Sequence, residues 1–368
     1  MDRISVISVL IAQRRVGRLA LTQEGLCAFE YDSEWVEDGY SISPFYLPLK
    51  GGLQIAKRDP FAGGFGVFDD SLPDGWGNLI LDRYLSERGI NPHKLTLLDR
   101  LALIGSSGRG ALEYHPDRSI ATNDDFRDFD KIAQYAEVLL GDKNGEVPVD
   151  DLYRYGGSSG GARPKIFTTI DDRHWLVKFK ATLDPQNIGE IEYNYSQLAR
   201  ECGINISDTT LFDGKYFGTE RFDRGKCGRI HTISAAGLLN ANYRIPSLDY
   251  SILLKLTLQL TRDMEQVKQM FRLMVFNILI SNRDDHAKNF SFQYRDNKWQ
   301  LSPAYDLLPS SGFNGNHTTT INGQGEPRLK DIITIAKEVG ISESETNEIV
   351  EGLIHICSTK GMLKIQLK

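Results

Sequence analysis

The residues best suited to chemistry form the run Asp284–Asn289, DDHAKN, with a second carboxylate downstream at Asp306. Asp284 and Asn289 are five positions apart and follow the apolar run Val267–Ile280, which predicts a buried helix. Phosphoryl transfer requires this set of groups: a carboxylate that orients the attacking hydroxyl, and an amide and a carboxylate oxygen that hold Mg²⁺. The D-x-x-x-x-N spacing matches the catalytic loop of kinases. Alone, such a motif is more often a solvated turn after a helix, so other segments must support it.

The residues between Asn289 and Asp306 predict how these groups meet. Phe290–Tyr294 and Lys298–Leu301 have strand character, and the polar residues 295–297 between them form a turn. A short hairpin therefore returns the chain to Asp306, and the three groups are expected around it.

A glycine- and serine-rich stretch, Tyr155–Lys165, is the most unusual part of the chain. Glycines let a backbone approach phosphates and present N–H donors to them. No Walker A lysine follows, because the glycines lead into Ala162 and Arg163, and there is no G-x-G-x-x-G. Alone, a Gly/Ser run is as often a flexible linker as a nucleotide loop.

Lys178 lies on the predicted strand Trp175–Phe179, close to where a lysine would meet the phosphates of a nucleotide. Glu192 lies on the helix that follows and could pair with it, as a strand lysine and a helix glutamate do in kinases. Exposed charges on a strand and a helix are the simpler interpretation of both residues.

The elements that must position these residues fall in two parts of different character. The first part predicts strands and then helices: strands at Ile4–Ala12, Arg18–Leu21 and Leu26–Tyr31, helices at Gly77–Leu85 and Lys94–Ile104. The second part reads glycine loop, strands, helix, strands and then helices, which predicts a small sheet-rich lobe on a larger helical lobe. The fold class predicted is α+β.

Residues 116–151 are polar and rich in aspartate, with one helix-like piece at Ile132–Leu140. We therefore predict an N-terminal domain over 1–116, a linker region over 117–151 and a second domain over 152–368. Its sheet-rich lobe spans about 152–224 and its helical lobe about 225–368.

The composition excludes several classes of protein. The 368 residues carry a formal net charge of −6, which argues against a main role in holding nucleic-acid phosphates. The four cysteines form no C-x-x-C pair and suit a reducing compartment. The histidines show no metal spacing, and no G-x-S-x-G motif indicates a serine hydrolase. Without a signal peptide or a membrane-length apolar run, the chain is expected to be cytoplasmic, with no membrane partner.

Four segments, taken in order, resemble the HipA family of bacterial serine/threonine kinases, the toxin half of HipA–HipB toxin–antitoxin pairs. The N-terminal region is similar to the small N-terminal domain of that family, notably at residues 29–32 and 71–76. The resemblance covers about residues 1–310 and implies a protein-kinase-like domain with an ATP lobe and a mostly helical lobe. The four segments are Ser158–Lys165, Glu220–Arg224, Asp284–Ser291 and Pro303–Asp306.

The resemblance implies roles residue by residue. Asp284 corresponds to the catalytic base, Asn289 and Asp306 to the Mg²⁺ ligands, and Lys178 to the lysine that meets the ATP phosphates. Ser158 matches the autophosphorylated serine of the family, with Ser159 as the alternative, and the family implies that this modification ejects the loop and inactivates the enzyme. The negative charge of a phosphoserine beside the ATP phosphates would oppose nucleotide binding. The other positions that match ATP-binding segments are Gly160, Gly161, Ala162, Arg163, Pro164, Lys165, Glu220, Arg221, Phe222, His286, Lys288 and Tyr305.

The function expected is therefore transfer of phosphate from Mg-ATP to a serine or threonine, with ATP and Mg²⁺ as cofactors. The family implies an aminoacyl-tRNA synthetase as acceptor, with growth arrest as the result. It also implies a HipB-like helix-turn-helix antitoxin as partner, through which the chain would meet DNA indirectly. Two alternatives stay open: a small-molecule phosphotransferase with the same site, and a catalytically silent scaffold that binds an antitoxin.

Overall fold

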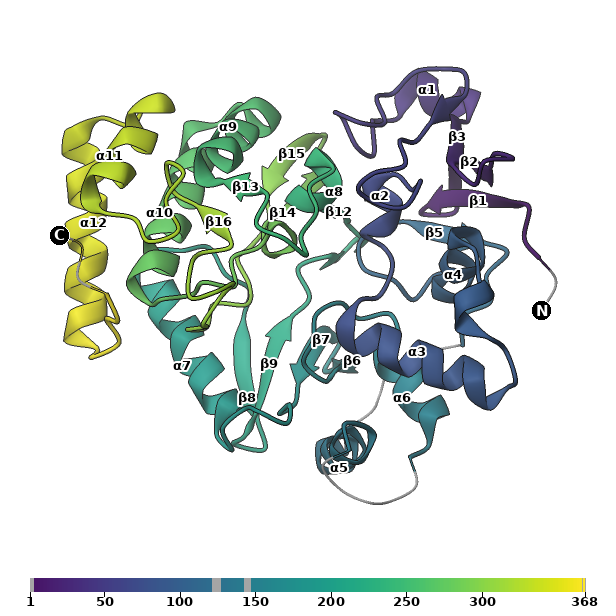
Figure 1. Ribbon diagram of the computed structural model, residues 1–368, viewed down its shortest axis with the longest axis horizontal. Helices are drawn as coiled ribbons and strands as arrows, with labels where there is room; N and C mark the ends of the chain where they lie inside the picture. The colour runs from purple at the N-terminus through teal and green to yellow at the C-terminus, as the bar shows by residue number, and fades with distance from the viewer. Residues whose placement is uncertain (1–2, 121–126, 142–146, 366, 368) are drawn as a thin grey trace. The chain divides into compact units, whose positions relative to one another are not determined.

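The structure is a computed structural model that describes residues 3–120, 127–141, 147–365 and 367 (Figure 1). Backbone contacts divide the chain into two units. The first unit consists of Met1–Glu190, Thr209–Ile233 and Gly237–Asn240, and the second of Ile191–Asp208, Ser234–Ala236 and Ala241–Lys368. Three elements have residues in both units: α7 (Ile188–Glu201), β12 (His231–Ser234) and α8 (Ala235–Leu239).

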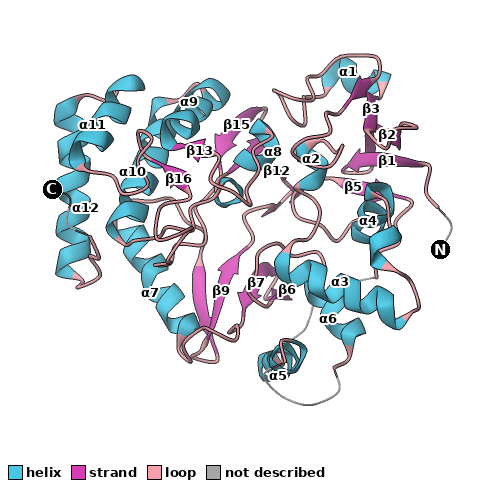
Figure 2. Cartoon of the chain, viewed as in Figure 1, coloured by secondary structure: helices cyan, strands magenta, loops and turns pink. Residues whose placement is uncertain are grey.

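The first unit begins with a five-stranded antiparallel sheet of order β4-β3-β2-β1-β5 (Figure 2). Alternation along β1 buries Ile7 and Val9 completely, as the period of a half-buried strand requires. Its strands are β1 (Val6–Ile11), β2 (Arg14–Leu21), β3 (Cys27–Tyr31), β4 (Gln54–Ile55) and β5 (Glu113–His115).

A second antiparallel sheet of the first unit has the order β6-β7-β9-β8. The β6–β7 hairpin turns through Asp171 and Asp172, which both have positive φ. The strands are β6 (Lys165–Ile170), β7 (Arg173–Lys178), β8 (Thr209–Phe212) and β9 (Tyr216–Glu220), followed by the small hairpin β10 (Arg224–Gly225) and β11 (Gly228–Arg229).

Helices α3, α4, α5 and α6 of the first unit contribute side chains to one hydrophobic core. Helix α3 packs against α6, and α6 packs against β6. Trp76, Ile80, Ile132, Leu152 and Val177 belong to this core, so it joins residues on both sides of the predicted linker. The helices are α1 (Ser33–Asp38), α2 (Gly66–Asp69), α3 (Gly75–Glu87), η1 (Pro92–Lys94), α4 (Leu97–Ile104), α5 (Phe129–Leu139) and α6 (Val149–Gly156).

The described part of the predicted linker over 117–151 contains helical structure. Positions 121–126 and 142–146 lie outside the described residues. The rest carries α5 and the start of α6, and Phe129 and Ile132 of α5 are buried in the core. Aspartates on the exposed faces gave this segment its polar composition, whereas its few apolar residues decide its packing. The helix expected at Ile132–Leu140 is α5, which begins three residues earlier.

The second unit is built around α10, whose side chains from Val267 to Leu279 are mostly buried. Helices α9 and α12 pack against α10, and α11 packs against α12. The helices are α9 (Tyr250–Thr261), α10 (Met264–Leu279), η2 (Ala287–Asn289), α11 (Leu329–Glu338) and α12 (Glu343–Thr359). The strands are β13 (Leu248–Asp249), β14 (Ser291–Arg295), β15 (Lys298–Leu301) and β16 (Thr319–Thr320).

The predicted elements around the candidate site are confirmed with small shifts. Helix α10 begins three residues before the predicted apolar run because Asp263 caps it, its side chain accepting the Glu265 N–H. The hairpin β14–β15 forms where it is predicted, with Phe292 paired to Leu301. Sheets and helices together confirm the α+β class. Within the described ranges, no helix has the length and apolar character needed to cross a membrane.

Candidate active site

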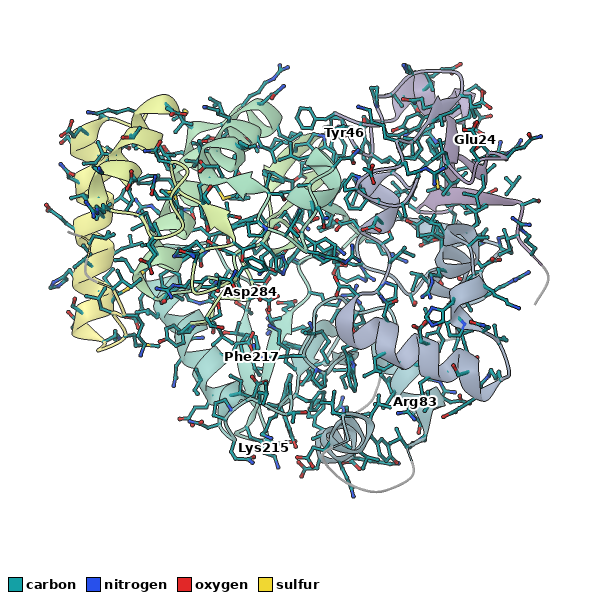
Figure 3. All side chains as sticks on the ribbon, viewed as in Figure 1. Glu24, Tyr46, Arg83, Lys215, Phe217 and Asp284 are labelled. Carbon is teal, nitrogen blue, oxygen red and sulfur yellow. The ribbon has the colours of Figure 1, made fainter. Side chains whose placement is uncertain are left out.

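The loop after α10 holds Asp284 at its backbone from two sides. The Asp284 N–H donates to Ser310 Oγ at 2.7 Å, and Asn289 Nδ2 donates to the Asp284 carbonyl at 2.6 Å. Asp284, labelled in Figure 3, is exposed, whereas its neighbour Asp285 is 1 % exposed. Two consecutive carboxylates therefore have opposite environments, one on the surface and one in the core.

The 3-10 turn η2 orders the middle of this loop. His286 Nδ1 accepts the Lys288 N–H at 3.2 Å and so caps the turn. The Lys288 ammonium lies 4.1 Å from the centroid of the Tyr243 ring, a cation–π contact. Tyr305 donates its hydroxyl to the Lys288 carbonyl at 2.6 Å, and the same hydroxyl is 2.6 Å from Ser291 Oγ. Tyr305 thereby connects the loop to the segment that carries Asp306.

Asp306 reaches the same loop through its backbone. Asn282 Nδ2 donates to the Asp306 carbonyl at 3.1 Å, and the Ala304 N–H donates to the Asn205 carbonyl at 2.8 Å. Asp306 has φ +54°, a left-handed conformation that a non-glycine residue rarely adopts without support. Asn289 and Asn282 of this loop thus bond to the backbones of Asp284 and Asp306, and the catalytic and metal-binding roles of the three residues stay predictions.

The donor set fits Mg²⁺ better than a transition metal. Among the described residues, no three His, Cys, Asp or Glu side chains converge on one point. Asn289 and Asp306 offer one amide oxygen and one carboxylate, both half-buried. Mg²⁺ takes few protein oxygens and fills its other positions with water and phosphate oxygens. Asn289 and Asp306 are therefore the residues that would hold the metal.

In the first unit, the glycine loop that follows α6 is pinned by hydrogen bonds. Ser158 Oγ donates to the Ser107 carbonyl at 3.0 Å, and Ser159 Oγ donates to the Gly156 carbonyl at 2.6 Å. Lys165 Nζ donates to the Gly160 carbonyl at 2.5 Å. Ser158 is half-buried and Ser159 is fully buried. The loop is therefore an ordered part of the first unit, which disfavours the linker interpretation.

The start of α3 packs directly on this loop. The Gly161 N–H donates to the Asp74 carboxylate, and the Trp76 N–H donates to the Gly161 carbonyl at 2.9 Å. A Cβ at Gly77 would lie 2.2 Å from the Ser159 carbonyl oxygen, so only glycine permits this approach. The sequence showed residues 71–76 only as a point of resemblance, and nothing in it indicated that they hold the loop.

Two lysines face each other at the end of the β6–β7 hairpin. Lys165 pairs with Lys178 in the register, and both are buried. This register places two positive charges on neighbouring strands beside the glycine loop. The Lys178 ammonium lies 5.6 Å from the centroid of the Phe217 ring, and Phe217 is labelled in Figure 3. The Phe179 N–H donates to the Pro164 carbonyl at 2.8 Å and joins the loop to this strand end.

Other predicted nucleotide-facing residues of the first unit make protein contacts. Arg163 forms a two-fold ion pair with Asp184, at 2.9 and 3.0 Å. The Glu220 carboxylate pairs with Arg173 Nη2 at 2.6 Å, and Glu220 lies opposite Trp175 in the sheet. Gly160, Gly161 and Ala162 are exposed. The roles of these residues toward ATP stay predictions.

The residue that follows the segment Glu220–Phe222, Asp223, is the centre of a buried ionic network that the sequence analysis did not predict. Asp223 accepts the Gly110 N–H at 2.7 Å and pairs with Arg221 and Arg224, each at 2.9 Å. Burial by itself raises the pKa of the Asp223 carboxyl, but the two arginine charges outweigh it and hold the pKa well below its usual range. Arg224 and Arg229 also donate to the Gly108 carbonyl, at 3.1 and 2.9 Å. The loop at 105–112 is thereby bonded both to this network and, through Ser107, to Ser158.

A family model described as the HipA-like C-terminal domain matches residues 157–360, more than half of the chain. The chain belongs to the HipA family. A second model, the HipA N-terminal domain, matches residues 7–115 of this HipA-family chain. The two matches cover the glycine loop, the catalytic-loop segment and the N-terminal sheet.

Two relatives of this HipA-family chain share between 24 % and 28 % of its residues over the aligned parts. A Sinorhizobium fredii protein that is a kinase by name, Y4dM, is 24 % identical over 382 residues, 96 % of this chain and 88 % of that protein. Toxin YjjJ of Escherichia coli is 28 % identical over 194 residues, 49 % of this chain and 42 % of the toxin.

The fold is that of a solved HipA. The structure of Shewanella oneidensis HipA with HipB and its operator DNA is similar with a TM-score of 0.69, at 18 % identity. The match covers 98 % of this chain and 92 % of that HipA chain. The predicted arrangement, a sheet-rich N-terminal region and a kinase-like fold, is thus confirmed.

Proposed function

We propose that this HipA-family protein is a serine/threonine protein kinase that uses Mg-ATP. The observation that carries the proposal is the meeting of Asp284, Asn289 and Asp306 through the bonds of Asn289 to the Asp284 carbonyl and of Asn282 to the Asp306 carbonyl. An exposed carboxylate beside an amide and a second carboxylate is the set that phosphoryl transfer uses. The kinase name of the relative Y4dM supports the same activity.

In this proposal, each residue of the second unit has one task. The exposed Asp284 carboxylate accepts a hydrogen bond from the acceptor hydroxyl, orients it and takes its proton as the phosphoryl group is transferred. Asn289 and Asp306 supply oxygens to Mg²⁺, which when bound neutralises charge on the phosphates. Lys288, His286 and Tyr305 hold the loop through the bonds described above.

The first unit binds the nucleotide. Lys165 and Lys178, buried and directly opposite each other, supply positive charge to the phosphates. The backbones of Gly160, Ala162 and Arg163 provide N–H donors, and the segment Glu220–Phe222 meets the adenine. Arg163 keeps this loop in place through Asp184.

Ser158 is the proposed autophosphorylation site. Ser158 is half-buried and bonded to the Ser107 carbonyl, while Ser159 is fully buried on the Gly156 carbonyl. Reaching Ser159 would require more of the loop to open, which favours Ser158. A phosphate on Ser158 would remove the donor to Ser107 and repel that carbonyl oxygen, releasing the loop.

We further propose a HipB-like helix-turn-helix antitoxin as partner and a component of translation, such as an aminoacyl-tRNA synthetase, as acceptor. The solved HipA that shares this fold is in complex with HipB and operator DNA, which supports the partner. The net charge of −6 favours contact with DNA through such a partner over direct binding.

The test is transfer of label from γ-labelled ATP with Mg²⁺, measured for the parent, Asp284→Asn and the matched control Asp296→Asn. Asp296 is an exposed carboxylate in the turn of the β14–β15 hairpin. Label on protein in the parent and in the control, but reduced about 100-fold or more in Asp284→Asn, is the expected result. Label on small molecules alone would favour a small-molecule phosphotransferase. Absence of both transfer and ATP binding would favour a scaffold.

A further inference from the structure

The buried carboxylate of Asp285, next to the exposed Asp284, is the centre of a hydrogen-bond network inside the second unit. Its Oδ1 accepts the N–H groups of Thr318 and Thr319, at 2.9 and 3.2 Å. Its Oδ2 accepts the Tyr250 hydroxyl at 2.9 Å and faces His317 Nδ1 at 2.8 Å. One side chain thus ties the catalytic-loop segment to α9 and to the segment that contains β16.

The network continues from Tyr250 to the backbone of Asp306. Asn277 Nδ2 donates to the Tyr250 hydroxyl at 3.0 Å, and Asn282 Nδ2 donates to Asn277 Oδ1 at 3.0 Å. The same Asn282 amide donates to the Asp306 carbonyl at 3.1 Å. The side chains of Asp285, Tyr250, Asn277 and Asn282 therefore form a continuous series of hydrogen bonds. It begins next to the proposed base and ends at the carbonyl of Asp306, a proposed metal ligand.

Burial fixes the donor and acceptor roles along this series of hydrogen bonds. Asn277, Asn282 and Asp285 are at most 3 % exposed, and Tyr250 is fully buried. Burial and the charge of Asp285 raise the pKa of Tyr250 well above its ordinary value, so the phenol remains a donor. Because the neutral phenol uses its one proton on Asp285, it must be the acceptor in its bond with Asn277. This sets the orientation of the Asn277 amide, and the Asn277 amide sets that of Asn282.

We propose that Asp285, Tyr250 and Asn282 are positioning residues of the kinase reaction. The network fixes the left-handed Asp306 backbone relative to Asp284, so that base and metal ligand keep one spacing. This inference rests on the proposed function and adds to it three side chains that touch neither nucleotide nor acceptor. Removing a residue that hydrogen-bonds to a metal ligand typically changes metal affinity or activity about 10- to 100-fold.

The variants that test the proposal are Tyr250→Phe and Asn282→Ala, with Thr257→Val as matched control. Thr257 is fully buried on the same helix as Tyr250, and its hydroxyl donates to the Leu253 carbonyl, outside the network. Tyr250→Phe and Thr257→Val each remove one buried hydroxyl from α9. The melting temperatures of the variants therefore show whether they are destabilised to a similar extent.

Three quantities are measured for each protein: kcat, KM for ATP at saturating Mg²⁺, and the affinity for Mn²⁺ in the presence of a non-hydrolysable ATP analogue. We expect both network variants to lose about 10-fold or more in kcat and in Mn²⁺ affinity, with KM for ATP changed less than 3-fold. The double variant should lose little more than either single variant, because both break the same chain.

Network variants whose kcat and Mn²⁺ affinity match those of Thr257→Val, in an active parent, would overturn the inference and leave the proposed function standing. A rise in KM for ATP with unchanged kcat would also overturn it. A parent that neither transfers phosphate nor binds Mn²⁺ with the nucleotide analogue would refute the proposed function, and the inference with it.

Discussion

Adjacent residues with opposite surroundings recur in this protein. Asp284 is exposed beside the buried Asp285, and half-buried Ser158 precedes the fully buried Ser159. In each pair the buried member is held by several or short hydrogen bonds, which leaves the other member as the one that can meet a substrate. In the proposed kinase, chemistry and positioning are therefore divided between neighbouring residues.

A buried histidine makes stability depend on pH. His231 is 2 % exposed, its Nε2 is 2.9 Å from the Ile42 carbonyl, and burial lowers its pKa to about 4. Between pH 6.5 and 4 the unfolded chain therefore binds a proton that the folded chain does not. The free energy of unfolding should fall on acidification, by up to about 3 kcal/mol from this group. Denaturant unfolding at pH 7 and pH 5 should show about 2 kcal/mol of this decrease.

His231→Gln is the comparison for that experiment, since it removes the titrating group and keeps a polar side chain near the Ile42 carbonyl. Its free energy of unfolding should depend less on pH over this range than that of the parent. Equal pH dependence in the two proteins would show that His231 is not the group responsible.

At the scale of elements, the segment that opens α3 acts as a support for the glycine loop. Asp74 and Trp76 bond to Gly161, and Gly77 lets the Ser159 carbonyl approach. Residues about 85 positions apart in sequence thereby form one structure. The N-terminal domain of the family is in this chain part of the machinery that shapes the proposed phosphate loop.

Gly77→Ala tests this support. The added Cβ would meet backbone 2.2 Å away, so we expect a loss of about 1–3 kcal/mol in the free energy of unfolding and a weaker affinity for ATP. Gly51→Ala is the control, because nothing lies within 4 Å of its added Cβ, and it should change stability by less than about 0.5 kcal/mol. An unchanged ATP affinity in Gly77→Ala would show that the loop does not need this contact.

The sequence predicted the local parts of the site and missed the distant ones. The hairpin β14–β15 and helix α10 follow from alternation and apolar periodicity, so the return of the chain to Asp306 could be predicted. The contacts of Asp285 with Tyr250 and His317 join residues more than 30 positions apart, and no periodicity encodes them. Asp223 lies in the segment Glu220–Arg224, which the sequence singled out by resemblance alone, and no pattern predicted that it would accept the N–H of Gly110, 113 positions away.

At the scale of the whole molecule, the two units hold different groups of the proposed kinase. The first unit holds the candidate phosphate loop, Lys165 and Lys178, and the second holds Asp284, Asn289 and Asp306. Nucleotide binding and metal binding should therefore be separable by substitution.

Thermal unfolding with ATP, with and without Mg²⁺, tests this separation. A ligand at 100 times its Kd stabilises the folded state by about 2.7 kcal/mol. If Mg²⁺ binds with ATP, the parent should melt at a higher temperature with Mg-ATP than with ATP alone. Asp306→Ala should keep the increase due to ATP and lose the increment due to Mg²⁺. Asp296→Ala, in the turn of the preceding hairpin, should keep both. Retention of the Mg²⁺ increment in Asp306→Ala would exclude Asp306 as a ligand.

The most direct measurement is the intact mass of the protein before and after incubation with Mg-ATP, for the parent, Asp284→Asn and Ser158→Ala. We predict that the parent gains one phosphate, that Asp284→Asn gains none, and that Ser158→Ala gains none. Gain in Ser158→Ala alone among the variants would keep the kinase and move the modified residue to a site such as Ser159. A parent that starts unmodified and gains no phosphate, or an Asp284→Asn variant that gains it as fast as the parent, would contradict the proposed kinase.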